Sequence, residues 1–273
     1  MVEKSYSVEH ENIANILSWI KDGKIGLPEM QRPFVWKSTQ VRDLVDSLYK
    51  GYPIGFIVTW ENPDAELKNG GKGQNKEIII DGQQRITALS AALEGNEIVN
   101  EKYLKKRIYI AFNPTTEEFA TRSAAIAKDP RWIPDISIFE DPNFSDYAYV
   151  TKNSKRLNLK PDELSKIIQK LKGISQYDIG VIKLNSKLPI DQVTDIFNRI
   201  NQKGTKLSSA DFAMSRLSSD TAHHGNDLRK EIEYFIQLYK DHSLLENIVK
   251  MDPEFANSNY FKHISWADKE DVT

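Results

Sequence analysis

The sequence predicts an α+β protein built around a mixed β-sheet with flanking helices, followed by a mainly helical C-terminal segment. Apolar residues recur four times at the i, i+3, i+4, i+7 spacing of an amphipathic helix. Short apolar runs rich in β-branched residues, which favour strands, lie among these patterns. Strands and helices follow one another in an irregular order, which favours a mixed sheet over a regular doubly wound fold.

The four helical patterns each predict a helix laid on a core. They cover residues 13–20, 41–48, 164–171 and 193–200. Ser7 is the expected N-cap of the first helix and Ser38 that of the second, because a serine hydroxyl accepts hydrogen bonds from free helix amides. Pro161 falls in the first turn of the third helix, where a missing N–H costs nothing.

Four short apolar runs predict strands, because they are too short for buried helices of ordinary length. They are Ile54–Trp60, Ile78–Ile80, Ile108–Phe112 and Ile179–Leu184. The polar, glycine-containing stretch 61–76 predicts a loop between two strands. From Ala222 onward only helical patterns occur, with Leu228, Ile232, Phe235, Ile236 and Tyr239 as the expected apolar face. We therefore predict a domain over residues 1–221 and a helical segment over residues 222–273.

Composition excludes several classes of protein. The 273 residues contain 40% hydrophobic and 28% charged residues, which is typical of a globular protein, and the net charge is only −2. The absence of cysteine excludes disulfide frameworks, thiolate zinc sites and cysteine nucleophiles. No apolar run reaches the roughly 20 residues of a membrane span. We expect a cytoplasmic protein that has no contact with a membrane.

The most specific local signal is a buried strand that enters a glycine turn and then a helix, over residues 78–89. Asp81 ends the strand and Gly82 makes the turn. Free amides and the dipole at a helix start favour phosphate. Arg85 can grip phosphate bidentately, and Gln83 and Gln84 can orient a water or a phosphate oxygen. The structural alternative has Asp81 capping the helix and Arg85 paired with a surface carboxylate.

Two further polar clusters are candidate parts of a site. In residues 27–36, Arg32 stands beside Phe34 and Trp36, although the aromatic rings alone are typical of a core. In residues 197–209, a helix runs into a loop that contains Asn and Gly. Asn198 and Asn201 are three residues apart and would share one face of that helix. An ordinary helix–loop–helix explains the same pattern.

Taken in order, these motifs resemble one family. Pro-x-x-Gln-Arg-Pro-Phe-Val-Trp, Asp-Gly-Gln-Gln-Arg-Ile-Thr-Ala-Leu and Phe-Asn-Arg-Ile-Asn-x-x-Gly-x-x-Leu-Ser are similar to the N-terminal domain of GmrSD-type restriction enzymes, over residues 7–217. The resemblance implies a ParB/sulfiredoxin-like fold that binds and hydrolyses a nucleoside triphosphate in a system that restricts modified or foreign DNA. The residues that it carries over are Gln31, Arg32, Asp81, Gly82, Gln83, Gln84, Arg85, Asn201 and Gly204.

The resemblance favours a Mg²⁺-dependent nucleoside triphosphatase. Asp81 would hold the metal or align the attacking water, while Arg85 and Arg32 would neutralise phosphate charge. The alternative is a nucleotide-switched DNA-binding module with little or no turnover, which uses the same contacts. We expect a homo-oligomer or a partner nuclease domain, because relatives often carry an HNH-type nuclease. The pair His223 and His224 lies in a helical pattern, so we expect no nuclease within these residues.

A local excess of positive charge makes DNA a further candidate partner. Residues 150–172 hold seven basic residues and two acidic ones. The basic residues of its first half, which would contact a phosphate backbone, are Lys152, Lys155, Arg156 and Lys160. A solvated amphipathic helix with its preceding loop explains the same composition.

Overall fold

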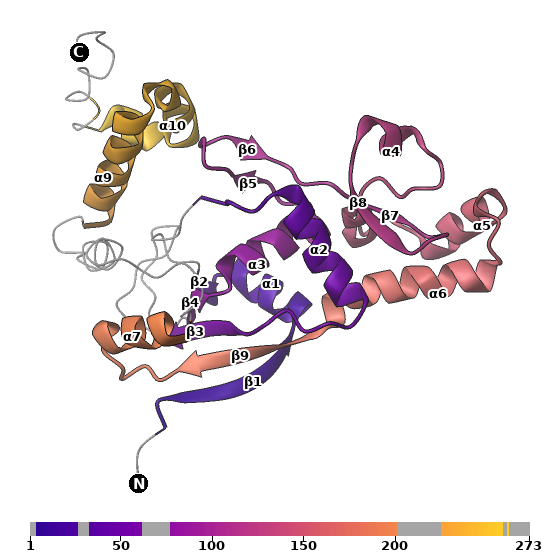
Figure 1. Cartoon of the computed structure of the whole chain (residues 1–273), viewed down its shortest axis with the longest axis horizontal. Coiled ribbons are helices and arrows are strands. Elements are labelled where there is room, and N and C mark those ends of the chain that lie inside the picture. Colours follow the sequence, from indigo (N-terminus) through magenta and orange to yellow (C-terminus); the bar gives the residue numbers. More distant parts are fainter. Residues whose placement is uncertain (1–3, 27–32, 62–76, 201–224, 259–260, 262–273) are drawn as a thin grey trace.

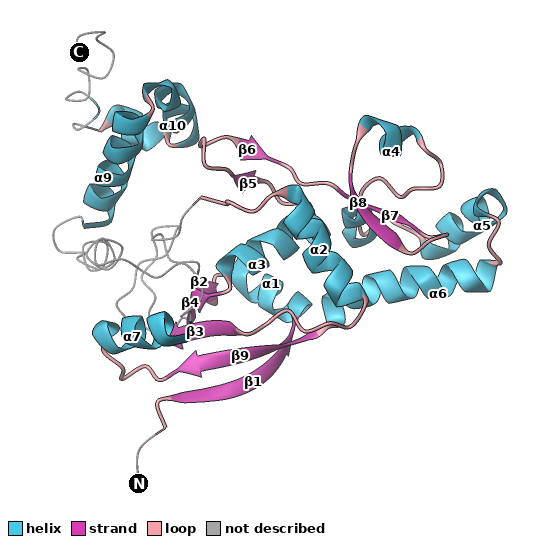
Figure 2. Ribbon diagram, viewed as in Figure 1, coloured by secondary structure: helices cyan, strands magenta, loops and turns pink. Residues whose placement is uncertain are grey.

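A five-stranded mixed sheet forms the centre of the molecule, and Figures 1 and 2 show a computed structural model of it. The structure describes residues 4–26, 33–61, 77–200, 225–258 and 261. In spatial order the strands are β1 (Tyr6–Asn12), β9 (Asp178–Leu184), β3 (Ile57–Glu61), β4 (Glu77–Asp81) and β2 (Ile25–Gly26). β3 runs parallel to β9 and antiparallel to β4. The predicted mixed sheet is confirmed.

One face of the sheet is covered by three helices (Figure 2). They are α1 (Ile13–Lys21), α2 (Ser38–Tyr49) and α3 (Gln83–Leu89), which continues as a short π-helical segment, Ser90–Glu94. Successive residues of a strand point to opposite faces. Ile57, Ile79 and Val181 therefore join the main core under these helices. Val58 and Trp60 face the other way.

The second face is covered in part by α7 (Ile190–Ile200). Val193 of α7 is buried in a small cluster with Val58 and Trp60, and Ile196 packs against them. The apolar spacing along residues 193–200 predicted this helix. Both faces of the central strands are thus apolar, which explains why their sequences read as continuous hydrophobic runs.

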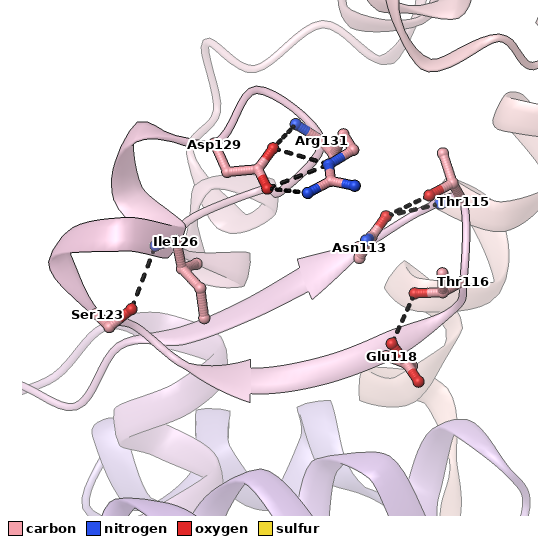
Figure 3. A network of polar contacts seen from close by, with 8 residues as sticks. All are labelled: Asn113, Thr115, Thr116, Glu118, Ser123, Ile126, Asp129 and Arg131. Atoms are coloured by element: carbon pink, nitrogen blue, oxygen red, sulfur yellow. Dashed lines mark hydrogen bonds and ion pairs between the residues drawn. The ribbon is translucent and has the colours of Figure 1, made fainter.

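A second lobe contains the hairpin of β7 (Ile110–Asn113) and β8 (Glu118–Thr121), with α4 (Ala124–Lys128), α5 (Asp146–Leu157) and α6 (Pro161–Lys172). Figure 3 shows the polar contacts that hold its turns. The Asn113 side chain accepts hydrogen bonds from Thr115, and Ser123 caps α4. Asp129 binds Arg131 through several hydrogen bonds. Short side chains that bond to nearby backbone amides are typical of such turns.

The described part of the C-terminal segment consists of helices joined by short turns. α9 (Gly225–Lys240), α10 (Leu245–Met251) and α11 (Pro253–Asn257) pack on the loop between two short strands, β5 (Ile98–Val99) and β6 (Lys105–Lys106). Tyr103 in that loop meets the ring of Tyr234 edge to face. A small apolar cluster with Leu238 and Phe255 completes the contact.

Three details of the predicted caps and apolar faces are wrong. Ser38 does not cap the second helix, because it is the first residue of α2 and Lys37 is the N-cap. Ser7 caps no helix, because residues 6–12 form edge strand β1 and the side chain of Asn12 caps α1 instead. The predicted apolar face of α9 is also wrong: Tyr239 is 69% exposed, whereas Tyr234 and Leu238 are buried. In the loop predicted for residues 61–76, Glu61 belongs to β3, and the remaining residues lie outside the described part of the chain. His223 and His224 also lie outside it. Within the described residues, no helix has the length and apolarity needed to cross a membrane.

Candidate functional site

The Asp-Gly-Gln-Gln-Arg motif forms the predicted strand–turn–helix. β4 ends at Asp81, Gly82 adopts a left-handed conformation with φ of 95°, and α3 begins at Gln83. The amide of Ile86 donates to the carbonyl of Gly82 at 3.0 Å, which closes the first helical turn. Among the described residues, no side chain caps the helix. The part of the structural alternative in which Asp81 caps the helix is therefore wrong, whereas its other part, an Arg85 paired with a carboxylate, is found.

Asp81 and Arg85 bind each other. Nη2 of Arg85 lies 3.1 Å from Oδ2 of Asp81, and Nη1 donates to the carbonyl of Ile54 at 2.8 Å. The Arg85 side chain is 17% exposed and that of Asp81 28% exposed. Burial lowers the pKa of Arg85, and the charge of Asp81 opposes this shift. A partly exposed carboxylate and a partly exposed guanidinium, four residues apart in the sequence, thus form an ion pair.

The loop before β3 fits closely around this pair. Gly55 has φ of 88°, and a Cβ atom placed there would lie 2.7 Å from Nη1 of Arg85. A side chain at this position would displace the guanidinium from the Ile54 carbonyl. Tyr52-Pro53-Ile54-Gly55 therefore positions Arg85, which the sequence pattern alone did not reveal.

Gln84 joins the first motif to the second. Its Oε1 accepts a hydrogen bond from the Val35 amide at 3.1 Å, and its Nε2 donates to the Pro33 carbonyl at 3.5 Å. Phe34 between them is buried in the main core, and Trp36 packs against that core. The core interpretation of these aromatic rings is confirmed. Gln84 therefore holds the backbone of Pro33 and Val35 in place. Gln31 and Arg32, which precede this segment, lie outside the described residues.

Gln83 faces a cavity of about 920 Å³ beside α3. Its side chain makes no hydrogen bond to a described residue, although the residue is only 8% exposed. Gln84, Ile86 and Thr87 also line the cavity, whereas Asp81 and Arg85 do not. The motif therefore presents Gln83 to the cavity and the Asp81–Arg85 pair to another side of the helix start.

The far wall of the cavity comes from α9, which sequence reasoning did not connect with the motif. Arg229 is buried there and binds Glu233 at 3.1 Å, and Glu233 also accepts a hydrogen bond from the Tyr103 hydroxyl. The described charged residues that line the cavity are Lys21, Arg229, Lys230, Glu94, Glu97, Glu140, Glu233 and Asp252. Acidic side chains outnumber basic ones, so the cavity itself is poorly suited to a polyphosphate.

The remaining predicted residues are not brought together at this turn. Asn198 lies on α7, which packs on the sheet face opposite to α1, α2 and α3. Asn201 and Gly204 lie outside the described residues. Within the described part of the chain, no group of three or more His, Asp or Glu residues forms a metal site. The geometry thus joins the residues of the Asp81–Arg85 motif with parts of residues 33–36 and 52–55.

The sequence matches the family described as "GmrSD restriction endonuclease, N-terminal domain" over residues 13–218, well over half of the chain. The chain belongs to the GmrSD N-terminal domain family. The match includes α3 and the Asp81–Arg85 pair. α9 to α11 lie beyond the matched residues, so the far wall of the cavity comes from outside the GmrSD domain.

One curated relative is similar to this chain over most of its length. The uncharacterized protein MJ0686 of Methanocaldococcus jannaschii is 24% identical over 242 residues, which cover 77% of this chain and 42% of the relative. The chain thus spans less than half the length of that protein.

The carboxyl group of Glu231 on α9 predicts that the free energy of unfolding depends on pH. Burial, and then the charge of Asp227, raise the pKa of Glu231 to about 7. Between its ordinary pKa and 7, the folded state holds a proton that the unfolded state has lost, so the free energy of unfolding falls as pH rises. Urea unfolding between pH 4.5 and 8 should show this fall, and Glu231→Gln should reduce it.

Glu246 provides the matched control, because a hydrogen bond from Lys250 lowers its pKa. Glu246→Gln should leave the decline between pH 4.5 and 7 in place. If Glu231→Gln and the parent lose the same stability over this interval, the assignment to Glu231 is wrong.

Proposed function

We propose that the chain binds a nucleoside triphosphate at the Asp81–Arg85 turn and hydrolyses it with Mg²⁺, as part of a DNA restriction or defence protein. The observation that carries the proposal is the partly exposed Asp81–Arg85 pair beside an uncapped helix start. A ParB/sulfiredoxin-like arrangement of the nucleotide is part of the same proposal. The family supports the restriction setting, and the contacts of the pair support the nucleotide.

Arg85 has donors left for a phosphate. A guanidinium carries five N–H donors, and hydrogen bonds within the described residues occupy two of them. The Ile54 carbonyl and the Asp81 carboxylate fix the plane of the group. Because its orientation is held before a ligand binds, less conformational entropy is lost when a phosphate arrives.

Asp81 fits the way in which proteins hold Mg²⁺ on a nucleotide. Magnesium is usually bound by one or two carboxylates together with the phosphates of the substrate. Oδ2 of Asp81 faces Arg85, whereas Oδ1 makes no hydrogen bond to a described residue. One oxygen would thus bind the metal while the other orients the guanidinium. The metal would neutralise charge on the phosphates.

The cavity would take the nucleoside. Its volume of about 920 Å³ suits an organic ligand, and the Gln83 amide offers one acceptor and two donors, as a base edge requires. The acidic excess among the lining residues keeps the phosphates outside, at the Arg85 end of the motif. Gln83 would then bind the ligand, while Gln84 holds the Pro33–Val35 backbone.

The test is a panel of ribo- and deoxyribonucleoside triphosphates titrated into the whole chain by calorimetry, with and without Mg²⁺, followed by phosphate release. Asp81→Asn should weaken Mg²⁺-dependent binding and lower hydrolysis at least tenfold, because an amide is a poor ligand for the metal. Asp46→Asn is the matched control: Asp46 is also 28% exposed and pairs with a cation four residues on.

Three outcomes separate the hypotheses. Phosphate release that Asp81→Asn abolishes and Asp46→Asn preserves supports the triphosphatase. Tight binding without release supports the alternative, a nucleotide-switched module. Equal binding by Asp81→Asn and the parent, at every Mg²⁺ concentration, would contradict the site.

The partners of the whole protein are also part of the proposal. Because the chain spans 42% of the relative's length, a nuclease acting with this domain would be supplied by further sequence or by a partner chain. A homo-oligomer would bring two copies of the Asp81–Arg85 turn to one DNA molecule. Gel filtration with and without nucleotide measures that assembly directly.

A further inference from the structure

Four basic side chains form an exposed surface on the second lobe, which we call the basic face. They are Lys152, Lys155 and Arg156 of α5 and Lys160, the N-cap of α6. Lys152 is three residues from Lys155 and four from Arg156, so the three share one side of the helix. Figure 1 shows α5 and the adjoining end of α6 at the opposite end of the molecule from α9 and α10.

The basic face has no acidic partner in the described part of the chain. None of its four cations forms an ion pair there. Further along α6, by contrast, Lys170 binds Glu117 at 2.9 Å and Lys172 binds Asp146 at 3.0 Å. The positive excess counted in the sequence is thus partly neutralised toward the end of α6 and left open on α5.

Helix electrostatics explain only part of this arrangement. Lys155 and Arg156 lie in the last turn of α5, where cations complement the helix dipole. Lys152 adds like-charge repulsion with Lys155 at i, i+3 and with Arg156 at i, i+4. Lys160 lies at a helix N-terminus, where the dipole disfavours a cation. An external anion would compensate both costs.

Two carboxylates lie near the basic face. Asp162 and Glu163 occupy the first turn of α6, and Glu163 accepts a hydrogen bond from the Lys160 amide at 3.1 Å. They keep an anion away from the α6 amides, so the contact must come from the cations.

We propose that the basic face binds the phosphate backbone of duplex DNA. A row of cations about one helical turn apart matches a polymer that carries regularly spaced negative charges. A bilayer fits less well, because the apolar residues of α5, such as Val150 and Leu157, are buried within the protein and cannot insert. The proposal is independent of nucleotide binding at Asp81–Arg85, since different residues carry it.

The test measures binding of the whole chain to a 30-base-pair duplex by fluorescence anisotropy, over a range of salt concentrations. Four phosphate contacts predict a slope of log K against log salt of about −3.6. Lys155→Gln/Arg156→Gln should reduce the slope to about −1.8 and weaken binding at least tenfold at about 0.1 M salt. Glutamine has a good helix propensity, so α5 should keep its structure.

The matched control is Lys105→Gln/Lys106→Gln on strand β6, where both lysines are exposed and the change of net charge is the same. The control should retain the slope and affinity of the parent. Equal losses in the two variants would overturn the proposal in favour of a net-charge effect. Lys160→Gln, which changes no residue inside a helix, provides a second test if the double variant unfolds.

Two further outcomes would also overturn the proposal. One is unchanged DNA binding by both Lys160→Gln and the folded double variant. The other is a variant that loses affinity for vesicles containing phosphatidylserine while its affinity for duplex DNA stays equal to that of the parent. A drop in DNA affinity confined to basic-face variants supports the proposal.

Discussion

Arg85→Ala is expected to lower triphosphate affinity by about 10- to 100-fold, because hydrogen bonds to charged groups contribute about 1.5–3 kcal/mol. The same change should lower the free energy of unfolding by a similar amount. Without the guanidinium, the Ile54 carbonyl and Asp81 lose the partners that the structure gives them.

Arg107→Ala separates the two effects. Arg107 binds Asp135 and Ser137 in the second lobe and takes no part in the motif. Its loss should lower stability and leave nucleotide affinity unchanged. Calorimetric titrations and melting curves of both variants, measured at a temperature where each is folded, provide the comparison. If Arg85→Ala and Arg107→Ala retain the same affinity, Arg85 does not bind the phosphates.

Gly82→Ala should be the most destabilising small substitution at the site, at about 2–5 kcal/mol. A left-handed conformation costs a residue with a Cβ about 1–2 kcal/mol, and overpacking in a core adds about 1–3 kcal/mol. Gly82 has φ of 95°, and its new Cβ would overlap the side chain of Ile57. Urea unfolding of the variant measures this loss.

Gly51→Ala is the matched control, because its φ is 74° and nothing lies within 4 Å of the position of a Cβ. It should show only the conformational cost of about 1–2 kcal/mol. Equal losses in the free energy of unfolding at the two glycines would mean that overlap between a Cβ at position 82 and Ile57 does not destabilise the protein. Nucleotide affinity should fall only in the Gly82 variant, since only that backbone carries the motif.

Long, regular patterns predicted the fold well, and ambiguous ones did not. α2 and α6 follow from apolar spacing because each has one clear apolar stripe to bury. The apolar residues of α9 form one broad side of the helix, so the pattern did not identify which part of that side would be buried, and Tyr234 and Leu238 were missed. β1 was missed because it is an edge strand: Glu9 and Glu11 interrupt its apolar residues, as is common where one edge meets water.

The candidate site could be predicted only where its parts are neighbours in the sequence. Asp81 and Arg85 are one helical turn apart, so a strand followed by a helix brings them together. The contact of Arg85 with Ile54, and that of Gln84 with the backbone at Pro33 and Val35, join residues far apart in the chain. Such contacts depend on how the elements pack, and the spacing of residue types within one segment does not encode them.

The order of the strands also affects how the protein folds while it is being synthesised. β9, which begins at Asp178, lies between β1 and β3. At about 5–20 residues per second on the ribosome, β1 would wait roughly 10–30 s for its neighbour to be synthesised. During that interval β1 and one edge of β3 are open to wrong partners on the same or another nascent chain. The acidic residues along β1 would limit such pairing until β9 leaves the ribosome and completes the sheet.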